Sequence, residues 1–272
     1  MNLSNQPISL EICIDDANGL RASCEGGADR VELCSALELG GLTPSAGLMK
    51  HALDAGISAM ALIRLRAGGF VYCSDEVSVM LRDIKIAQEI GITGVVIGAA
   101  NNDGTLDIDV LGRMCEAAGS LDITLHRVFD LTPDPKKAID QAVELGISRI
   151  LTSGQKINVA DGVETLAALS AYAGSRISIM PGAGIKPENV TRIVEQTGAS
   201  EVHTSCGSRS GEVSPELVAF GFADKAPRKQ ASMHSVREMR ELLNAITTQK
   251  STHAVGGNSS AKHPTSQKGV GQ

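Results

Sequence analysis

Aromatic residues are scarce in this sequence: they make up 2% of its 272 residues, and tryptophan is absent. The apolar fraction is nevertheless 42%, so a core must be filled by aliphatic side chains. This amount of apolar sequence is enough for one domain of about 250 residues. Aliphatic, β-branched sequence of this kind is typical of buried parallel strands.

An excess of positive charge and long apolar runs are also missing. The formal net charge is -6 and the isoelectric point is near 5.5, so we expect neither nucleic acid nor an anionic membrane as a partner. No run of about 18 apolar residues is available to cross a bilayer. Because Met1 to Ser9 lack the basic and apolar regions of a signal peptide, the sequence predicts a soluble, cytoplasmic protein.

The cysteines are dispersed and form no C-x-x-C pair, which argues against a zinc knuckle and a thioredoxin motif. In a reducing cytosol they would be free thiols. The six are Cys13, Cys24, Cys34, Cys73, Cys115 and Cys206.

Short apolar runs recur along the chain, and each is followed by turn residues and then by a helical pattern. This alternation is typical of parallel β/α units. The predicted strands are Leu10 to Ile14, Arg30 to Cys34, Ala59 to Arg64, Gly94 to Gly98, Ile123 to His126, Arg149 to Ser153, Ile177 to Met180 and Glu201 to Ser205. Eight such units predict a single TIM-type (β/α)8 barrel.

The C-terminal part departs from this repeat. Residues Ser208 to Lys229 have loop composition, and Met233 to Ile246 are predicted to form one amphipathic helix. Residues 249–272 have almost nothing to bury, so we expect a disordered tail there. The predicted domain therefore spans residues 1–248.

Polar and ionisable residues stand at the ends of many of the predicted strands. Residues two apart share one face of a strand. The pairs are Glu11 with Cys13, Glu32 with Cys34, Arg64 with Arg66, Thr124 with His126, Leu151 with Ser153, and His203 with Ser205. Because TIM barrels build their active sites at the C-terminal ends of their strands, these residues predict a functional site there.

The residue types leave two interpretations of this rim open. In one, Glu11, Glu32, Arg64 and Arg127 neutralise each other inside the barrel. In the other, the protein is an enzyme acting on a small anionic or phosphorylated metabolite. The acid, base or catalytic candidates are then Glu11, Glu32, His126, Asp130 and His203. The candidates for holding the anion are Arg64, Arg66, Arg127, Ser153, Gly182, Gly184 and Ser205.

Cys13 and Cys34 close the first and second predicted strands. These strands are neighbours in any barrel of this kind, so the two sulfurs can approach each other. Soft thiolates select Cu(I), whereas buried cysteines often pack as small inert hydrophobic residues. The spacing alone does not decide between a copper site and two inert thiols.

Five motifs together resemble the CutC family of copper homeostasis proteins over about residues 9 to 207. They are Gly27-Ala28-Asp29-Arg30-Val31-Glu32-Leu33-Cys34, Gly40-Gly41-Leu42-Thr43-Pro44-Ser45, His126-Arg127-Val128-Phe129-Asp130, Leu151-Thr152-Ser153-Gly154 and Pro181-Gly182-Ala183-Gly184. The resemblance implies a cytoplasmic TIM barrel with a role in copper tolerance. It also implies Cu(I) binding at Cys13 and Cys34.

The chain differs from the family pattern in two places. Gly69 stands where the family usually has Asp, with Cys73 where Ser is common, and the segment after Ser210 diverges. The lost acid puts a catalytic role of that loop in question, and the altered segment affects any contacts within a homo-oligomer. A scaffold that works through its surface or as a dimer is the third hypothesis that the sequence leaves open.

Overall fold

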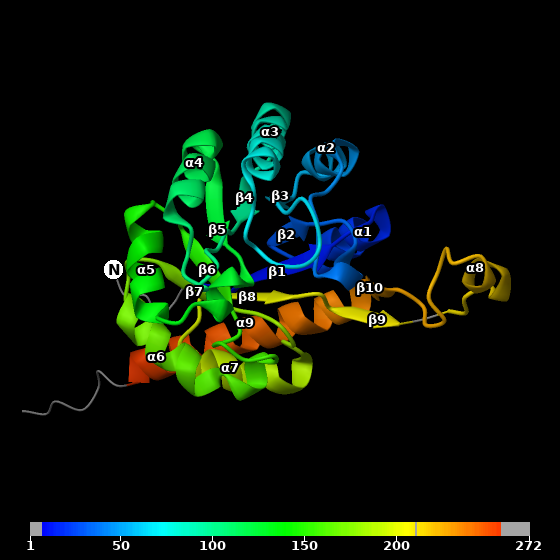
Figure 1. Cartoon of the computed structure of the whole chain (residues 1–272). Helices are drawn as coiled ribbons and strands as arrows, with labels where there is room; N and C mark the ends of the chain where they lie inside the picture. The colour runs from blue at the N-terminus through cyan, green and yellow to red at the C-terminus, as the bar shows by residue number, and fades with distance from the viewer. Residues whose placement is uncertain (1–6, 210, 257–272) are drawn as a thin grey trace, which may run out of the picture.

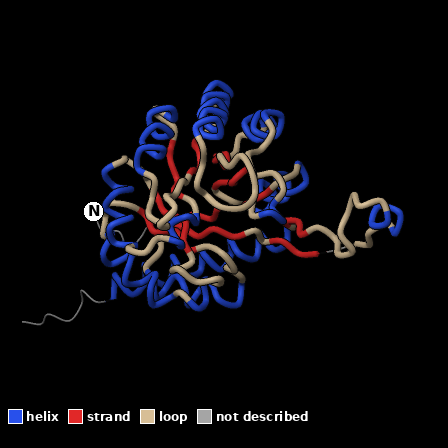
Figure 2. The backbone as a smooth tube through the Cα atoms, viewed as in Figure 1, coloured by secondary structure: helices blue, strands red, loops and turns tan. Residues whose placement is uncertain are grey.

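The computed structural model describes residues 7–209 and 211–256, and it confirms the predicted barrel (Figure 1). Figure 2 shows the strands gathered in the centre with the helices outside them. The strands are β1 (Ser9–Ile14), β2 (Arg30–Leu33), β3 (Ser58–Leu62), β4 (Gly94–Ile97), β5 (Asp122–Leu125), β6 (Arg149–Thr152), β7 (Ser178–Pro181) and β8 (Glu201–Thr204). All eight coincide with predicted strands, and their ends differ by about two residues at most.

The eight strands form one parallel sheet in the order β7-β6-β5-β4-β3-β2-β1-β8. Each strand except β8 pairs with the strand that precedes or follows it in sequence, and β1 also pairs with β8. Strands β7 and β8 lie against each other, but no regular ladder joins them within the described residues. The barrel is therefore nearly closed.

Helices cover the outside of this sheet. They are α1 (Ala17–Gly26), α2 (Ala46–Asp54), α3 (Ser74–Ile90), α4 (Ile108–Ala118), α5 (Pro135–Glu144), α6 (Val163–Ala173), α7 (Pro187–Thr197) and α9 (Met233–Gly256). Short 3-10 helices, η2 (Leu37–Leu39), η3 (Arg127–Leu131) and η4 (Val159–Asp161), lie in the loops after β2, β5 and β6. The main apolar core fills the space between strands and helices.

The predicted signals that end helices and return the chain to the sheet are present. Gly27 follows α1 with φ 86°, and its N–H bonds to the carbonyls of Cys24 and Ser23. Gly198 follows α7 with φ 68°. Glycine adopts this left-handed conformation without the steric penalty of a Cβ atom, which lets each helix stop abruptly before the next strand.

The helix α9 takes the place of the eighth barrel helix. It packs against α1 and α7. Arg240 anchors it, because its guanidinium pairs with Asp29 at 2.5 Å and donates to the carbonyl of Ile8 at 2.8 Å. The helix extends to Gly256, beyond the predicted end at Ile246, and the rest of the predicted tail lies outside the described residues.

Between β8 and α9 the chain forms an arm that extends away from the barrel (Figure 1). An antiparallel ribbon of β9 (Gly207–Arg209) and β10 (Lys229–Ala231) forms its base, and the short helix α8 (Pro215–Ala219) lies at its far end. No residue of α8 is buried, and the side chains of Phe220 and Phe222 are 77% and 81% exposed. This segment, which has the composition of a loop, thus contains short regular elements that the sequence did not predict.

The contact between α1 and α9 provides a test of the fold. A Cβ atom at Gly26 would lie 2.5 Å from Cβ of Val236 on α9. We expect Gly26→Ala to lower the free energy of unfolding by about 1–3 kcal/mol because the helices must separate. Gly69→Ala is the matched control: its Cβ would meet nothing within 4 Å, so the change should stay within about 0.5 kcal/mol. Equal urea denaturation midpoints for the two variants would contradict the described packing.

Candidate functional site

The C-terminal ends of the strands open into a cavity of about 350 Å³. It is lined by Cys13, Glu32, Cys34, Leu37, Gly40, Leu62, Arg64, Phe70, His126, Arg127, Leu151, Ala183 and His203. Seven of the predicted site residues are in this set, although they come from five different strands or the loops after them. The barrel therefore brings residues that are distant in sequence to one opening.

A layer of ion pairs lies beneath the cavity, at the N-terminal ends of the strands. Arg30 donates to Glu201 at 2.7 Å, and Arg149 pairs with Glu201 at 3.0 Å. Arg149 also pairs with Asp122 at 2.6 Å, at the start of β5. These buried charges offset the cost of leaving water by pairing with each other, so the layer closes the floor of the barrel.

Glu11 connects this floor to the cavity. One carboxylate oxygen accepts from Arg30 Nε at 2.5 Å, and the other lies 2.8 Å from His203 Nδ1. Burial of Glu11 alone would raise its pKa, but the hydrogen bond with His203 and the charge of Arg30 lower this pKa to about 2. Glu11 is therefore ionised, and it holds the imidazole ring with Nε2 on the side away from the floor.

Glu32 faces the other nitrogen of the same ring, with its carboxylate 3.7 Å from His203 Nε2. Burial is the main reason that the pKa of Glu32 is raised to about 7; the charge of His203 opposes the rise and that of Glu11 adds to it. Burial would lower the pKa of His203, but Cys13, Glu11 and Glu32 raise it well above the usual value. At neutral pH His203 is therefore protonated, and Glu32 is protonated in part, whereas an exposed glutamate would be ionised.

Cys13 completes a set of three side chains that can hold a metal ion. One donor atom from each of Cys13, Glu32 and His203 lies within 4.8 Å of the others. Glu11 supports this set because a carboxylate bonded to one imidazole nitrogen fixes the orientation of the other nitrogen. The three donors are one sulfur, one nitrogen and one oxygen.

Cys34 lies at the edge of this set rather than inside it. It lines the same cavity, but its side chain is buried and packs with Met60, Leu62 and Val96 on the inner face of the barrel. Burial, followed by the negative charge of Glu32, raises the pKa of the Cys34 thiol well above its ordinary value. The thiol is therefore held in its protonated form.

Arg64 forms another part of the cavity wall. Its two terminal nitrogens donate to the carbonyls of Leu39, Gly41 and Gly68 at 2.9–3.0 Å. Its Nε atom has no hydrogen-bond partner among the described residues, and no salt bridge to Arg64 occurs within them. The first interpretation of the rim, in which Arg64 is neutralised by the glutamates, is therefore not what the geometry shows.

His126 follows the last residue of β5, lies near Arg64 and is buried. Its Nδ1 accepts a hydrogen bond from the backbone N–H of Val128 at 3.0 Å, while Nε2 has no partner within the described residues. Burial and then the charge of Arg64 lower the pKa of His126 to about 3. The ring is therefore neutral, and its proton is on Nε2 because Nδ1 is an acceptor.

Asp130 and Arg127 hold the loop after β6. The Asp130 carboxylate accepts from Arg127 Nε at 2.8 Å, from Thr152 Oγ1 at 2.5 Å and from the backbone N–H of Gln155 at 3.0 Å. Ser153 joins them, and its hydroxyl lies 2.7 Å from Arg127 Nη2 and 3.0 Å from Asp130. All of these groups have partners, so this cluster positions Arg127 at the cavity instead of offering a free acid.

Five of the predicted anion-binding residues do not line this cavity: Ser153, which belongs to the Asp130 cluster, and Arg66, Gly182, Gly184 and Ser205. Arg66 is 40% exposed and pairs with Glu76 of α3. A Cβ atom at Gly182 would meet Leu151 at 2.4 Å, and one at Gly184 would meet Asn158 at 2.6 Å, so both glycines allow close packing. Ser205 lines a different pocket.

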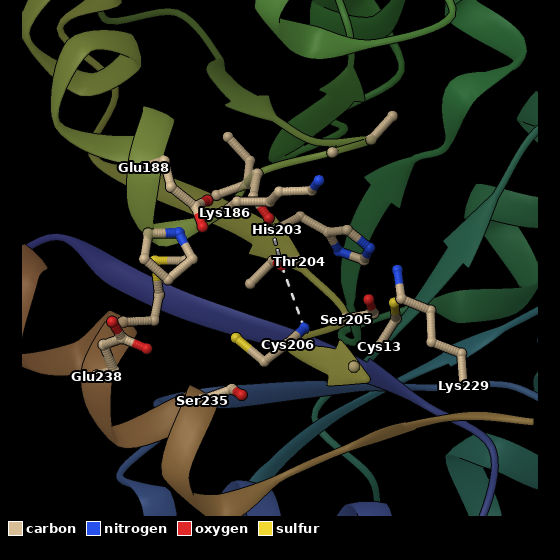
Figure 3. Close-up of a pocket in the computed structure, with 16 residues that line it drawn as sticks. Cys13, Lys186, Glu188, His203, Thr204, Ser205, Cys206, Lys229, Ser235 and Glu238 are labelled. Carbon is tan, nitrogen blue, oxygen red and sulfur yellow. Dashed lines mark hydrogen bonds between the residues drawn. The ribbon is translucent and has the colours of Figure 1, made fainter. Parts of the chain in front are cut away.

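That second pocket, of about 400 Å³, lies beyond the ends of β7 and β8 (Figure 3). The residues labelled in Figure 3 include Lys186 and Glu188 from the start of α7, Ser235 and Glu238 from α9, and His203 and Cys13. Cys13 and His203 line both pockets, so they stand on the wall between them.

The strand-end pattern missed the residues of the ion-pair floor. Arg30, Arg149 and Glu201 are the first residues of their strands. The sequence did contain a signal for them, since each is a charged residue at the start of an otherwise apolar strand. Alternation places the three on the same inward face as Glu32, Leu151 and His203, respectively.

Comparisons with known proteins show the family and support the fold. The model of the CutC family matches residues 8–208. The chain belongs to the CutC family. A CutC family protein from Agrobacterium fabrum is 46% identical over 241 residues, covering 88% of this chain and 95% of the relative. A CutC family protein from Caulobacter vibrioides is 44% identical over 246 residues, covering 90% of this chain and 100% of the relative.

A solved CutC structure supports the same conclusion. The crystal structure of CutC from Streptococcus agalactiae, provisionally described as a copper homeostasis protein, has 35% identity and a TM-score of 0.70. It covers 73% of this chain and 98% of that chain. The resemblance seen in the five motifs and the barrel predicted from the strand pattern are thus both confirmed.

Gly69 and most of the arm, where this CutC chain departs from the family pattern, are exposed, whereas α9 is packed on the barrel. Gly69 lies in the exposed loop between β3 and α3, and its carbonyl accepts from Arg66 at 3.0 Å. The arm and α9 follow the end of the family match at residue 208. Within residues 7–209 and 211–256, no helix has the length and apolar character needed to cross a membrane.

The buried neutral ring of His126 makes a prediction about pH. The folded-state pKa of about 3 is below the unfolded value of 6.5, so the unfolded chain takes up a proton first as pH falls. His126 therefore contributes stability above pH 6.5 that is lost as pH falls towards 3, by at most about 1.4 kcal/mol per pH unit.

His126→Asn keeps an N-cap acceptor but removes this titration. We expect acid denaturation of the variant to be less steep than that of wild type between about pH 6.5 and 4. His51→Asn on the exposed face of α2 is the control and should leave the slope unchanged. Parallel stability–pH curves for wild type and His126→Asn would contradict a buried neutral ring.

Proposed function

We propose that this protein binds Cu(I) at the mouth of its barrel and contributes to copper tolerance. The observation that carries the proposal is the position of Cys13, whose sulfur lies with Glu32 and His203 at the wall shared by two pockets. The description of the CutC relative from Streptococcus agalactiae as a copper homeostasis protein supports the same ligand.

The donor chemistry fits a soft metal ion. Thiolate sulfur and imidazole nitrogen both suit Cu(I), which accepts low coordination numbers. Cys13 supplies the first ligand, because it is partly exposed to the cavity and is not sequestered in an apolar cluster as Cys34 is. The second ligand is His203 Nε2 or the sulfur of Cys34, which the resemblance to the family implies.

Glu11 and Glu32 have supporting roles in this proposal. Glu11 holds the ring of His203 through Nδ1, and Glu32 places a carboxyl beside Nε2. A hard carboxylate oxygen is a poor ligand for Cu(I) but a good one for Zn²⁺. We expect the site to bind Cu(I) more tightly than Zn²⁺, and titrations with the two ions measure this preference.

The proposed compartment is the cytoplasm. All six cysteines are free thiols in the structure, which is the state that the reducing cytosol maintains. A thiol at the mouth of a pocket in that compartment remains available to Cu(I).

Anaerobic titration against a chromophoric Cu(I) chelator tests the proposal. Wild type is expected to take up about one Cu(I) per chain, and Cys13→Ser to take up none. Cys24→Ser, on the exposed face of α1, is the matched control and should bind as wild type does. Binding that survives in Cys13→Ser, or no binding by wild type, would overturn the proposal.

Two further variants identify the second ligand. Loss of binding in Cys34→Ser with retention in His203→Asn supports a two-sulfur site, and the opposite result supports sulfur and imidazole. A Zn²⁺ titration in parallel should show weaker binding, because zinc usually takes four ligands and the set of Cys13, Glu32 and His203 offers three. Tighter binding of Zn²⁺ than of Cu(I) would contradict the assignment to copper.

A further inference from the structure

The wall of the cavity around Arg64 has an unbalanced positive charge. Arg64 is 6% exposed, and its guanidinium donates three hydrogen bonds to neutral carbonyls. No carboxylate pairs with it among the described residues, and Nε is left without a partner there. A buried charge normally has a counter-ion, so this guanidinium lacks the anion that such a position requires.

A second unsatisfied donor lies next to it. Because Nδ1 of His126 accepts from Val128, the neutral ring carries its proton on Nε2, and that N–H has no partner within the described residues. Phe70 packs against both groups, with its ring 4.9 Å from that of His126 and 5.1 Å from the guanidinium carbon of Arg64. Arg64 Nε and His126 Nε2 are thus two donor atoms at one wall of the cavity without a hydrogen-bond partner in the described residues. The buried Tyr72 hydroxyl, also without a partner there, lies near Arg64, whose charge opposes the rise that burial gives the pKa of Tyr72.

Arg127 adds positive charge at the same opening. Its guanidinium reaches the cavity while Asp130 and Ser153 hold one edge of it. The Asp130 carboxylate is itself bonded to Thr152 and to backbone N–H groups of the β6 loop. Arg127 is therefore positioned as a rim charge, and it is 39% exposed.

The rest of the cavity selects the size and shape of a ligand. Apolar side chains of Leu37, Leu62, Phe70 and Leu151 line it. A volume of about 350 Å³ is within the range of pockets for small molecules. These walls fit a molecule with an apolar part of a few carbon atoms beyond its charged group.

From this arrangement we propose that the cavity binds a small organic anion, with its carboxylate or phosphate held by Arg64, His126 and Arg127. The site goes beyond copper binding, because it lies on the wall formed by β3 and β5 and their loops and uses none of the proposed metal ligands. Glu32 is the one carboxylate that lines the cavity within the described residues.

Calorimetric titration of metal-free protein tests the site. The probes are benzoate and phenyl phosphate, with acetate and inorganic phosphate as charged groups without an apolar part and benzamide as the uncharged analogue. We expect one of the two organic anions to bind, acetate and inorganic phosphate to bind more weakly, and benzamide not to bind. The tighter of the first two distinguishes a carboxylate ligand from a phosphate ligand.

The variants separate this site from nearby alternatives. Arg64→Gln should weaken binding about ten- to a hundredfold, as expected for loss of a hydrogen bond to a charged group. Arg66→Gln, which removes an exposed arginine outside the cavity, should leave the affinity unchanged. His126→Asn should weaken binding several-fold and provides the test if Arg64→Gln fails to fold, because Arg64 also ties three loop carbonyls together.

The result is independent of the copper proposal. Cys13→Ser should retain anion binding while it loses Cu(I). Absence of binding by wild type, equal affinity for benzamide, or full affinity in both Arg64→Gln and His126→Asn would each overturn the anion site. None of these outcomes would change the copper titration.

Discussion

The hydrogen-bonded carboxylate of Glu11 is the constraint on which the rest of the site depends. It lies between Arg30, which belongs to the ion-pair floor, and His203, which belongs to the cavity. Because the carboxylate is buried and its pKa is lowered to about 2, it remains charged and keeps both partners in place. The orientation of the imidazole, and with it the cluster around Cys13, therefore follows from the packing of charges below it.

The residue types inside the barrel differ between its floor and its cavity, and between two walls of that cavity. The floor is neutralised by its own pairs, whereas the cavity above it has one wall of sulfur, imidazole and carboxyl and another of unpaired donors. The first wall suits a soft metal ion and the second an organic anion. The two proposed sites share one opening, so the proposed ligands could bind separately or together.

The fold could be predicted from the sequence because it depends on repeated local signals, such as Gly27 at the end of α1 and the apolar run of β4. The positions of some site residues could also be predicted, because alternation along the strands places Glu32, His126 and His203 at one opening, as the structure does. It failed for Arg66 because β3 ends at Leu62 and alternation stops with the strand. It could not distinguish a glycine that contacts ligand from one that, like Gly182, makes room for a neighbouring Leu151 side chain.

The protonation state of His203 in metal-free protein tests most directly whether an ionised Glu11 carboxylate holds its imidazole ring. Nitrogen NMR of the ring at about pH 7.5, roughly one unit above the usual histidine value of 6.5, reports each nitrogen separately. If Cys13 and the ionised Glu11 act on the ring as described, both nitrogens carry protons at that pH, and Glu11→Gln moves the loss of one proton to lower pH. A neutral ring in wild type, with one bare nitrogen, would contradict the role assigned to Glu11.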